Sequence, residues 1–224
     1  QMVVAVERML TEQTDLAEKM RKKAYVDAVT GLMNRNDFSE RVIHLLGAPT
    51  KFATGALAVV RIRGFAAYNE KNGRVEGDAL LKRVAQLLGK AIEGRPGALL
   101  AKLDGPEYGV VVPEIQETEV AALGDAVIAA LAEIEEFPRT ESSLMAHAGM
   151  TFYRHHEGAA FGKLMATMGA ALGVAQARGV PAWHMELEAA AQAVNTMYAE
   201  INGMFKVGLP ADRMPAVTIR EHEF

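Results

Sequence analysis

The feature that most constrains the fold of this chain is a pair of short apolar runs joined by a tight turn. Residues 99–103 and 108–112 are rich in Leu, Ala and Val, and the four residues Asp104-Gly105-Pro106-Glu107 separate them. Asp and Gly both tolerate the positive φ that tight hairpin turns need, and Pro106 has no N–H group to donate to a strand ladder. The sequence therefore predicts a β-hairpin whose tip presents the carboxylate of Glu107 beside a proline.

Strand and helix patterns alternate along the rest of the chain. Apolar runs predict further strands, and apolar residues spaced by three and four predict amphipathic helices. We expect strands at 55–62, 144–152 and 180–184. We expect helices at 75–92, 120–134 and 161–178, and one that follows a turn at Gly31 and buries Phe38, Val42 and Leu45. This alternation predicts an α/β fold, and the hairpin makes its sheet mixed.

Composition limits the classes of protein to consider. The chain has 224 residues, half of them apolar, which suits one domain with extensions. A net charge of −4 argues against a broad surface for nucleic acid, and the absence of cysteine excludes disulfides and thiolate metal sites. The histidines His147, His155, His156 and His184 lack metal-ligand spacing. No apolar run is long enough to span a membrane.

The first 26 residues predict one long helix. One row of positions is spaced alternately by three and four, which is coiled-coil spacing, and is apolar except at Gln13: Val3, Val6, Leu10, Gln13, Ala17, Met20 and Ala24. One interpretation is a surface helix packed on its own domain. The other is a parallel dimer stalk that brings a signal from upstream, and the absence of glycine and proline before Gly31 favours it. We therefore expect a homodimer formed through residues 1–26.

Two segments carry a resemblance to the GGDEF family, the diguanylate cyclases that join two GTP molecules into cyclic di-GMP. The hairpin tip, Asp104-Gly105-Pro106-Glu107-Tyr108, resembles the signature Gly-Gly-Asp-Glu-Phe. Residues 27–38 resemble the motif Asp-x-Leu-Thr-Gly-Leu-x-Asn-Arg-x-x-Phe at almost every letter. The resemblance implies a nucleotidyl-cyclase-like, five-stranded mixed sheet surrounded by helices over residues 27–185, preceded by the coiled-coil helix.

The same resemblance implies that the metal site is lost. The metal-binding strand of the family reads Asp-Ile-Asp, and here it is Arg61-Ile62-Arg63; the acidic third letter of the signature is Pro106. Two guanidinium groups invert the local field and repel a dication. We therefore expect no metal at the former ligand positions Arg61 and Pro106, no cofactor and no cyclase activity. Arg61 either pairs with Glu107 or binds a triphosphate in place of Mg²⁺.

Other positions of the family are partly kept. Asn69 and Asp78 match the residues that read guanine, although Asp78 could instead support the start of its helix and Asn69 could satisfy loop backbone. The phosphate-binding lysine has become Gln176. Arg95 keeps half of the inhibitory Arg-x-x-Asp site for the product, whose aspartate has become Ala98. With Arg61, Asn69 and Asp78 are the nucleotide-binding candidates.

A second resemblance concerns the first 40 residues. Glu12-Gln13, Ala17-Glu18, Arg21, Ala24-Tyr25 and Asp27 resemble the stalk of LapD-type receptors, which are inner-membrane proteins with a HAMP linker and degenerate GGDEF and EAL domains. It implies the cytoplasmic portion of an inner-membrane protein that controls adhesion or biofilm. Residues 186–224 would form a helix and a linker toward an EAL domain. The expected function is an inactive regulatory and dimerisation relay; the alternatives are a GTP-binding sensor and a residually active cyclase.

Overall fold

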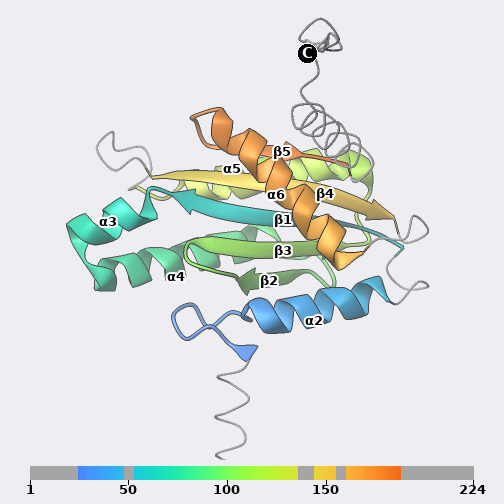
Figure 1. Cartoon of the computed structure of the whole chain (residues 1–224), viewed down its shortest axis with the longest axis horizontal. Coiled ribbons are helices and arrows are strands. Elements are labelled where there is room, and N and C mark those ends of the chain that lie inside the picture. Colours follow the sequence, from blue (N-terminus) through green and yellow to red (C-terminus); the bar gives the residue numbers. More distant parts are fainter. Residues whose placement is uncertain (1–24, 48–52, 136–143, 155–159, 188–224) are drawn as a thin grey trace, which may run out of the picture. The chain divides into compact units, whose positions relative to one another are not determined.

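Five strands form one mixed sheet in the order β2-β3-β1-β4-β5 (Figure 1). The computed structural model describes residues 25–47, 53–135, 144–154 and 160–187. Strand β1 is antiparallel to β3 and β4, β2 is antiparallel to β3, and β5 is parallel to β4. The strands are β1 Thr54–Arg63, β2 Leu99–Lys102, β3 Glu107–Pro113, β4 Met145–Arg154 and β5 Ala182–Met185. The predicted mixed five-stranded sheet and its hairpin are confirmed.

Helices cover both faces of the sheet (Figure 1). Helices α2 and α6 pack on one face, and α4 and α5 pack on the other. Alternate side chains of β1 point to opposite faces of the sheet. Leu57 and Val59 belong to the core cluster beneath α2 and α6, and Val60 belongs to the cluster beneath α4 and α5. The helices are α2 Arg35–Leu46, α3 Phe65–Asn72, α4 Arg74–Ala91, α5 Val120–Ala132 and α6 Phe161–Ala177, with a 3₁₀ turn at Glu117–Glu119. The nearly continuous apolar pattern of β1 follows from burial on both faces.

Helix α2 is fixed against the hairpin by its cap and by one aromatic ring. The side chain of Asn34 accepts hydrogen bonds from the backbone N–H groups of Asn36 and Asp37, which satisfies the first turn of the helix. The ring of Phe38 lies against Gly109 of β3, where a Cβ atom would be 2.8 Å from the ring carbon Cζ. Any larger residue at position 109 would therefore push α2 away from the sheet.

The structure departs from the expected elements in four places. Helix α3 was not expected; it begins after Gly64, whose positive φ reverses the chain at the end of β1. In the turn only Gly105, and not Asp104, takes a positive φ. Val26 forms a β-bridge with Met33 instead of ending the first helix.

Glu186 and Leu187, where the C-terminal helix was expected to begin, are not helical. The remainder of the two predicted terminal segments, residues 1–24 and 188–224, lies outside the described residues. Within the described ranges, no helix has both the length and the apolar character needed to cross a bilayer.

Candidate functional site

The hairpin tip and the end of β1 lie side by side at one end of the sheet. The turn is closed by two backbone hydrogen bonds, from Leu103 N to Glu107 O and from Glu107 N to Asp104 O, each 2.9 Å long. Glu107, the first residue of β3, stands directly opposite Arg61 in the antiparallel register. The sheet thus brings together residues 46 positions apart in sequence, on the same face.

Arg61 and Glu107 form an ion pair. The Nε of Arg61 donates to Oε1 of Glu107 at 2.6 Å, and a terminal guanidinium nitrogen contacts the same oxygen. The Glu107 side chain is 21% exposed, so this is a partly buried pair and not a solvated surface one. The ion pair expected from the sequence is therefore present. The same contact fits poorly with a divalent cation, because the carboxylate of Glu107 is already paired with an arginine.

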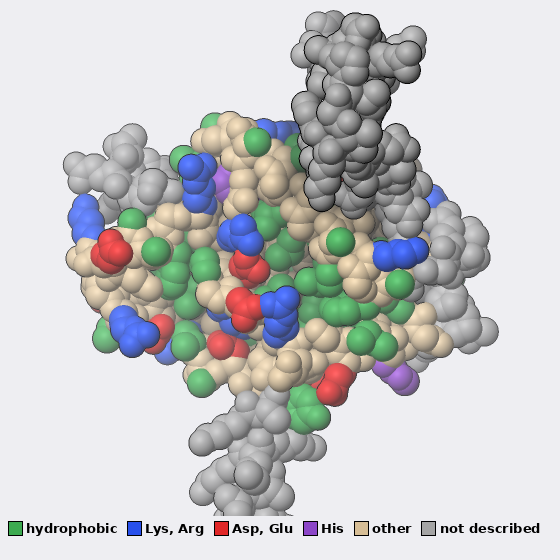
Figure 2. All heavy atoms as spheres, viewed as in Figure 1, with side chains coloured by type: hydrophobic (Ala, Val, Ile, Leu, Met, Phe, Trp, Pro, Cys, Tyr) green, Lys and Arg blue, Asp and Glu red, His purple; other side chains and the backbone are tan. Residues whose placement is uncertain are grey.

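Two further cations hold the turn from other elements. Arg35, the first residue of α2, pairs with Asp104, and the ammonium of Lys102 donates to the carbonyl oxygen of Gly105. Together, Arg35, Arg61 and Lys102 form what we call the cation clamp of the hairpin. Its members come from α2, β1 and β2, so three separate segments contact the four-residue turn. Acidic and basic side chains are interleaved on this face of the molecule rather than segregated (Figure 2).

Lys102 is the buried member of the cation clamp. Its side chain lies over the ring of Tyr108, 5.3 Å from the centroid, and the residue is 4% exposed. Burial lowers the pKa of Lys102, and the charges of Asp27, Asp104 and Glu107 oppose that effect. Tyr108 donates its hydroxyl to the carbonyl of Leu81, and its burial raises its pKa. Position 108 thus anchors the hairpin to α4 as a core residue.

The segment before α2 is joined to the same hairpin. Met33 forms a parallel bridge with Ala101, and Lys102 N donates to Met33 O at 2.9 Å. Asp27 closes the preceding turn by accepting from both the backbone N–H and the hydroxyl of Thr30. The chain therefore passes from residue 25 directly onto the edge of β2, beside the cation clamp.

The two guanine-reading candidates lie on neighbouring helices. Asn69 is on α3 and Asp78 is on α4, where Asp78 is exposed. The amide of Asn69 lies over Gly77, because a Cβ atom there would be 1.8 Å from Oδ1. That buried oxygen has no hydrogen-bond partner among the described residues. Asn69 is thus not consumed in satisfying loop backbone through Oδ1 among the described residues.

Arg95 is remote from the hairpin tip. It lies in the connection between α4 and β2 and lines a cavity of about 290 Å³ with Pro113 at the far end of β3. The carboxylates of Glu114 and Glu119 line the same cavity. Two negative charges around one arginine disfavour a dianionic ligand.

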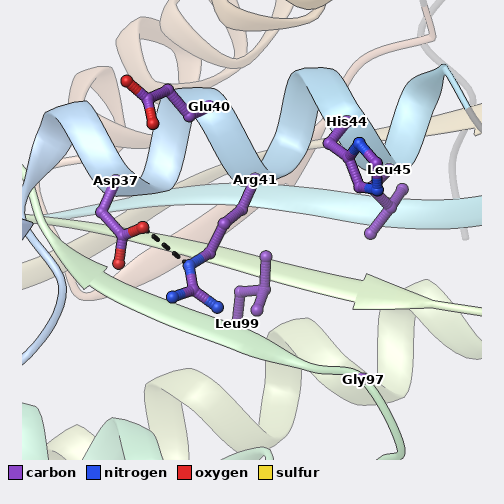
Figure 3. Close-up of a pocket in the computed structure, with 7 residues that line it drawn as sticks. All are labelled: Asp37, Glu40, Arg41, His44, Leu45, Gly97 and Leu99. Atoms are coloured by element: carbon purple, nitrogen blue, oxygen red, sulfur yellow. Dashed lines mark hydrogen bonds and ion pairs between the residues drawn. The ribbon is translucent and has the colours of Figure 1, made fainter.

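A second hollow lies between α2 and the beginning of β2 (Figure 3). Its volume is about 520 Å³, and Asp37, Glu40, Arg41, His44, Leu45, Gly97 and Leu99 line it. Arg41 extends from α2 toward Leu99, and its Nε donates to Oδ1 of Asp37 at 2.8 Å (Figure 3). This hydrogen bond raises the pKa of Arg41. Neither hollow is lined by residues of the hairpin turn.

His147 extends the cross-strand row of Glu107 and Arg61. It stands opposite Arg61 on β4 and is completely buried. Burial lowers the pKa of His147; the backbone of Val180 opposes this, and the charge of Arg63 reinforces it. The described part of the chain contains no cluster of three or more His, Cys, Asp or Glu side chains arranged to hold a metal ion.

Comparison with known proteins gives the family. The model of the diguanylate cyclase GGDEF domain matches residues 24–180. The chain belongs to the GGDEF domain family. The matched range includes both the hairpin tip and residues 27–38.

Relatives of this GGDEF domain are parts of larger proteins. It is 29% identical over 126 residues to the cyclic di-GMP phosphodiesterase PdeB of Shewanella oneidensis; the match covers 56% of this chain and 14% of that protein. Two solved structures share the fold with a TM-score of 0.68 and 19% identity. They are the S helix-GGDEF-EAL part of Vibrio cholerae LapD bound to c-di-GMP, and the coiled coil and GGDEF domain of Caulobacter crescentus DgcB in complex with c-di-GMP. This chain is covered to 85% and 82%, and those chains to 45% and 97%.

Sequence reasoning missed three contributors to this site. The roles of Lys102 and Arg35 in holding the turn were not expected, although Lys102 is two residues before the turn and Arg35 is in the opening motif. His147 was considered only as a metal ligand. Its cross-strand position opposite Arg61 follows from strand register, which the sequence alone does not provide.

Proposed function

We propose that this GGDEF domain does not make cyclic di-GMP and acts as a regulatory relay in a cyclic di-GMP signalling protein. The ion pair between Arg61 and Glu107 carries the proposal. A cyclase needs hard oxygen ligands for Mg²⁺ and a carboxylate near the attacking hydroxyl. Here Glu107 is neutralised by Arg61, and Pro106 offers no side-chain oxygen at the adjoining position.

The attachment of the upstream segment supports the relay. Residues 25–35 contact β2 and the turn through the Met33 bridge and the pair between Arg35 and Asp104. A displacement at residue 25 would therefore reach the hairpin without crossing a solvent-filled gap. We further propose that the domain dimerises through residues 1–26 and that it serves a LapD-type receptor at the inner membrane, with an EAL domain after residues 186–224. Support for the receptor assignment comes from the first 40 residues and the likeness to LapD.

The first experiment is an activity assay. The chain is incubated with GTP and Mg²⁺, and cyclic di-GMP is sought by HPLC beside an active member of the family. We expect no product from this chain. Product formed at a rate comparable to that of the active control would overturn the proposal that the domain is inactive, whether or not it also transmits a signal.

A second candidate function is binding of GTP without turnover. The placement of the Asn69 amide over Gly77, the residue before Asp78, favours it because it brings the two guanine-reading candidates to neighbouring turns of α3 and α4. Isothermal titration with GTP, with and without Mg²⁺, tests it. If GTP binds, Asn69→Ala should weaken binding by roughly tenfold, because one buried hydrogen bond is lost.

Asn72→Ala is the matched control for this titration. Asn72 lies on the same helix, is exposed, and donates to Tyr68 O at 3.0 Å. Removing the Asn72 side-chain amide should leave the affinity for GTP unchanged. Binding that persists without Mg²⁺ would favour Arg61 as the phosphate ligand. If titration with GTP releases no heat, GTP binding is rejected and the regulatory relay is the function that still stands.

A further inference from the structure

The face of β4 that α6 covers is polar where a buried face is usually apolar. His147, Thr151 and Tyr153 alternate along this face with Gly149, and all three are at most 2% exposed. Neither ring nitrogen of His147 nor the hydroxyls of Thr151 and Tyr153 have a hydrogen-bond partner among the described residues. The backbone of Val180 lies near the imidazole and opposes the lowering of its pKa. Buried polar groups without partners weaken the attachment of whatever covers them.

The opposite face of β4 is an internal comparison. Ala146, Ala148, Met150 and Phe152 belong to the larger core cluster with residues of α4 and α5. These side chains are apolar, so β4 places no unpaired polar side chain beneath α4 and α5. The two sides of one strand therefore present different chemistry to the helices that cover them.

Helix α6 also contains residues that lower its intrinsic helix stability. Gly162, Gly169 and Gly173 lie on its exposed side, and a Cβ atom at any of them would meet nothing within 4 Å. None has a positive φ, so neither backbone conformation nor packing in the described chain requires glycine there. Each such glycine lowers helix stability relative to alanine. Gly149 is different, because a Cβ atom there would be 2.2 Å from the carbonyl oxygen of Met168.

We propose that α6 is a pH-sensitive latch: it separates from β4 while the rest of the sheet stays folded, and His147 couples this opening to pH. This device goes beyond the relay function and does not depend on it. Opening would expose His147, the fully buried member of the row that it forms with Glu107 and Arg61. No ligand is needed for the transition.

The charges around His147 determine the direction of the effect. Arg61, neutralised by Glu107, and Arg63 face it from β1, and His184, which pairs with Glu186, lies on the same face of β5. The covering side of α6 is uncharged and consists of Leu164, Thr167, Met168, Ala171, Leu172 and Ala175. Closed α6 therefore holds a neutral imidazole next to arginines.

The sign of the pH dependence follows. The pKa of His147 is lowered in the closed state and returns toward about 6.5 when water reaches the ring. The open state thus binds more protons, so closure is fully stable above about pH 6.5 and weakens as the pH falls below it. The open population should rise by up to about tenfold per pH unit over that range.

Hydrogen exchange of the 1–224 chain, read by mass spectrometry, tests the latch. Opening constants, corrected for the intrinsic pH dependence of exchange, are compared for peptides from α6 and α4. At about pH 5.5 we expect α6 to open up to about fivefold more than at pH 6.5, and α4 to remain unchanged. Gly173→Ala should lower the opening constant of α6 by about fivefold. His147→Gln should abolish the pH dependence, and His184→Gln, on the neighbouring strand, should retain it.

Two results would overturn the latch. One is an α6 that is as protected as α4 at both pH values, and the other is a pH dependence that survives in His147→Gln. Should that variant not fold, the wild-type chain is carbethoxylated near neutral pH and the modified histidines are mapped. Gly173→Ala must then slow modification of His147 and leave that of His184 unchanged; equal rates for His147 in both proteins would refute the proposal.

Discussion

At the residue scale, the two carboxylates of the hairpin tip are in different environments. The Glu107 side chain is 21% exposed and lies within the sheet beside Arg61, whereas the Asp104 side chain is 66% exposed at the surface beside Arg35. An ion pair in solvent contributes little because water screens both charges. A partly buried pair matters more, because removing one partner leaves the other charge desolvated.

Glu107→Gln and Asp104→Asn should therefore differ in their effect on stability. We expect Glu107→Gln to lower the free energy of unfolding by about 1–2 kcal/mol, since Arg61 loses its charged partner. Asp104→Asn should lower it by less than about 1 kcal/mol. Urea unfolding followed by circular dichroism measures both. Equal losses would mean that Arg61 is as well solvated as Arg35.

At the element scale, glycines on and beneath α6 have opposite roles. The helix backbone lies so close to β4 that a Cβ atom on Gly149 would be 2.3 Å from the backbone nitrogen of Leu172. The glycine is needed there because backbone atoms cannot move aside as a flexible side chain can. On the outer side of α6, Gly173 faces open space.

The matched pair Gly149→Ala and Gly173→Ala tests this arrangement. Gly149→Ala should destabilise the domain by about 2–3 kcal/mol, because overpacking forces α6 from the sheet. Gly173→Ala should stabilise it by roughly 0.5–1 kcal/mol through helix propensity. Thermal unfolding gives both signs directly. A Gly149→Ala variant with an unchanged stability would show that α6 can shift away from β4 without destabilising the domain.

At the scale of the whole molecule, the open question is how copies of the chain associate. The sequence predicts a coiled coil over residues 1–26, of which 1–24 lie outside the described residues. In the described part, residue 25 leads onto β2 and the cation clamp, so any dimer stalk would connect directly to the hairpin. The relay therefore requires a dimer whose partner contacts precede residue 26.

We expect the 1–224 chain to be a dimer and Leu10→Lys to shift it toward monomer by at least about tenfold in dissociation constant, because a charge would be buried in the apolar seam. Thr14→Lys, off the predicted apolar positions, is the control and should stay dimeric. Light scattering after size exclusion measures the mass. A monomeric wild type would favour a surface helix packed on its own domain.

The sequence by itself determined the sheet, its hairpin and the family, because apolar periodicity and turn chemistry are local properties. Glu107 and its pairing with Arg61 were also predictable, since the resemblance aligned both positions with one site. Tertiary structure alone decided which groups meet by register and helix placement: Lys102 beneath the turn, Asn69 over Gly77, and His147 opposite Arg61. Such contacts join segments distant in sequence, and no local pattern specifies the register or the approach of a helix to a strand.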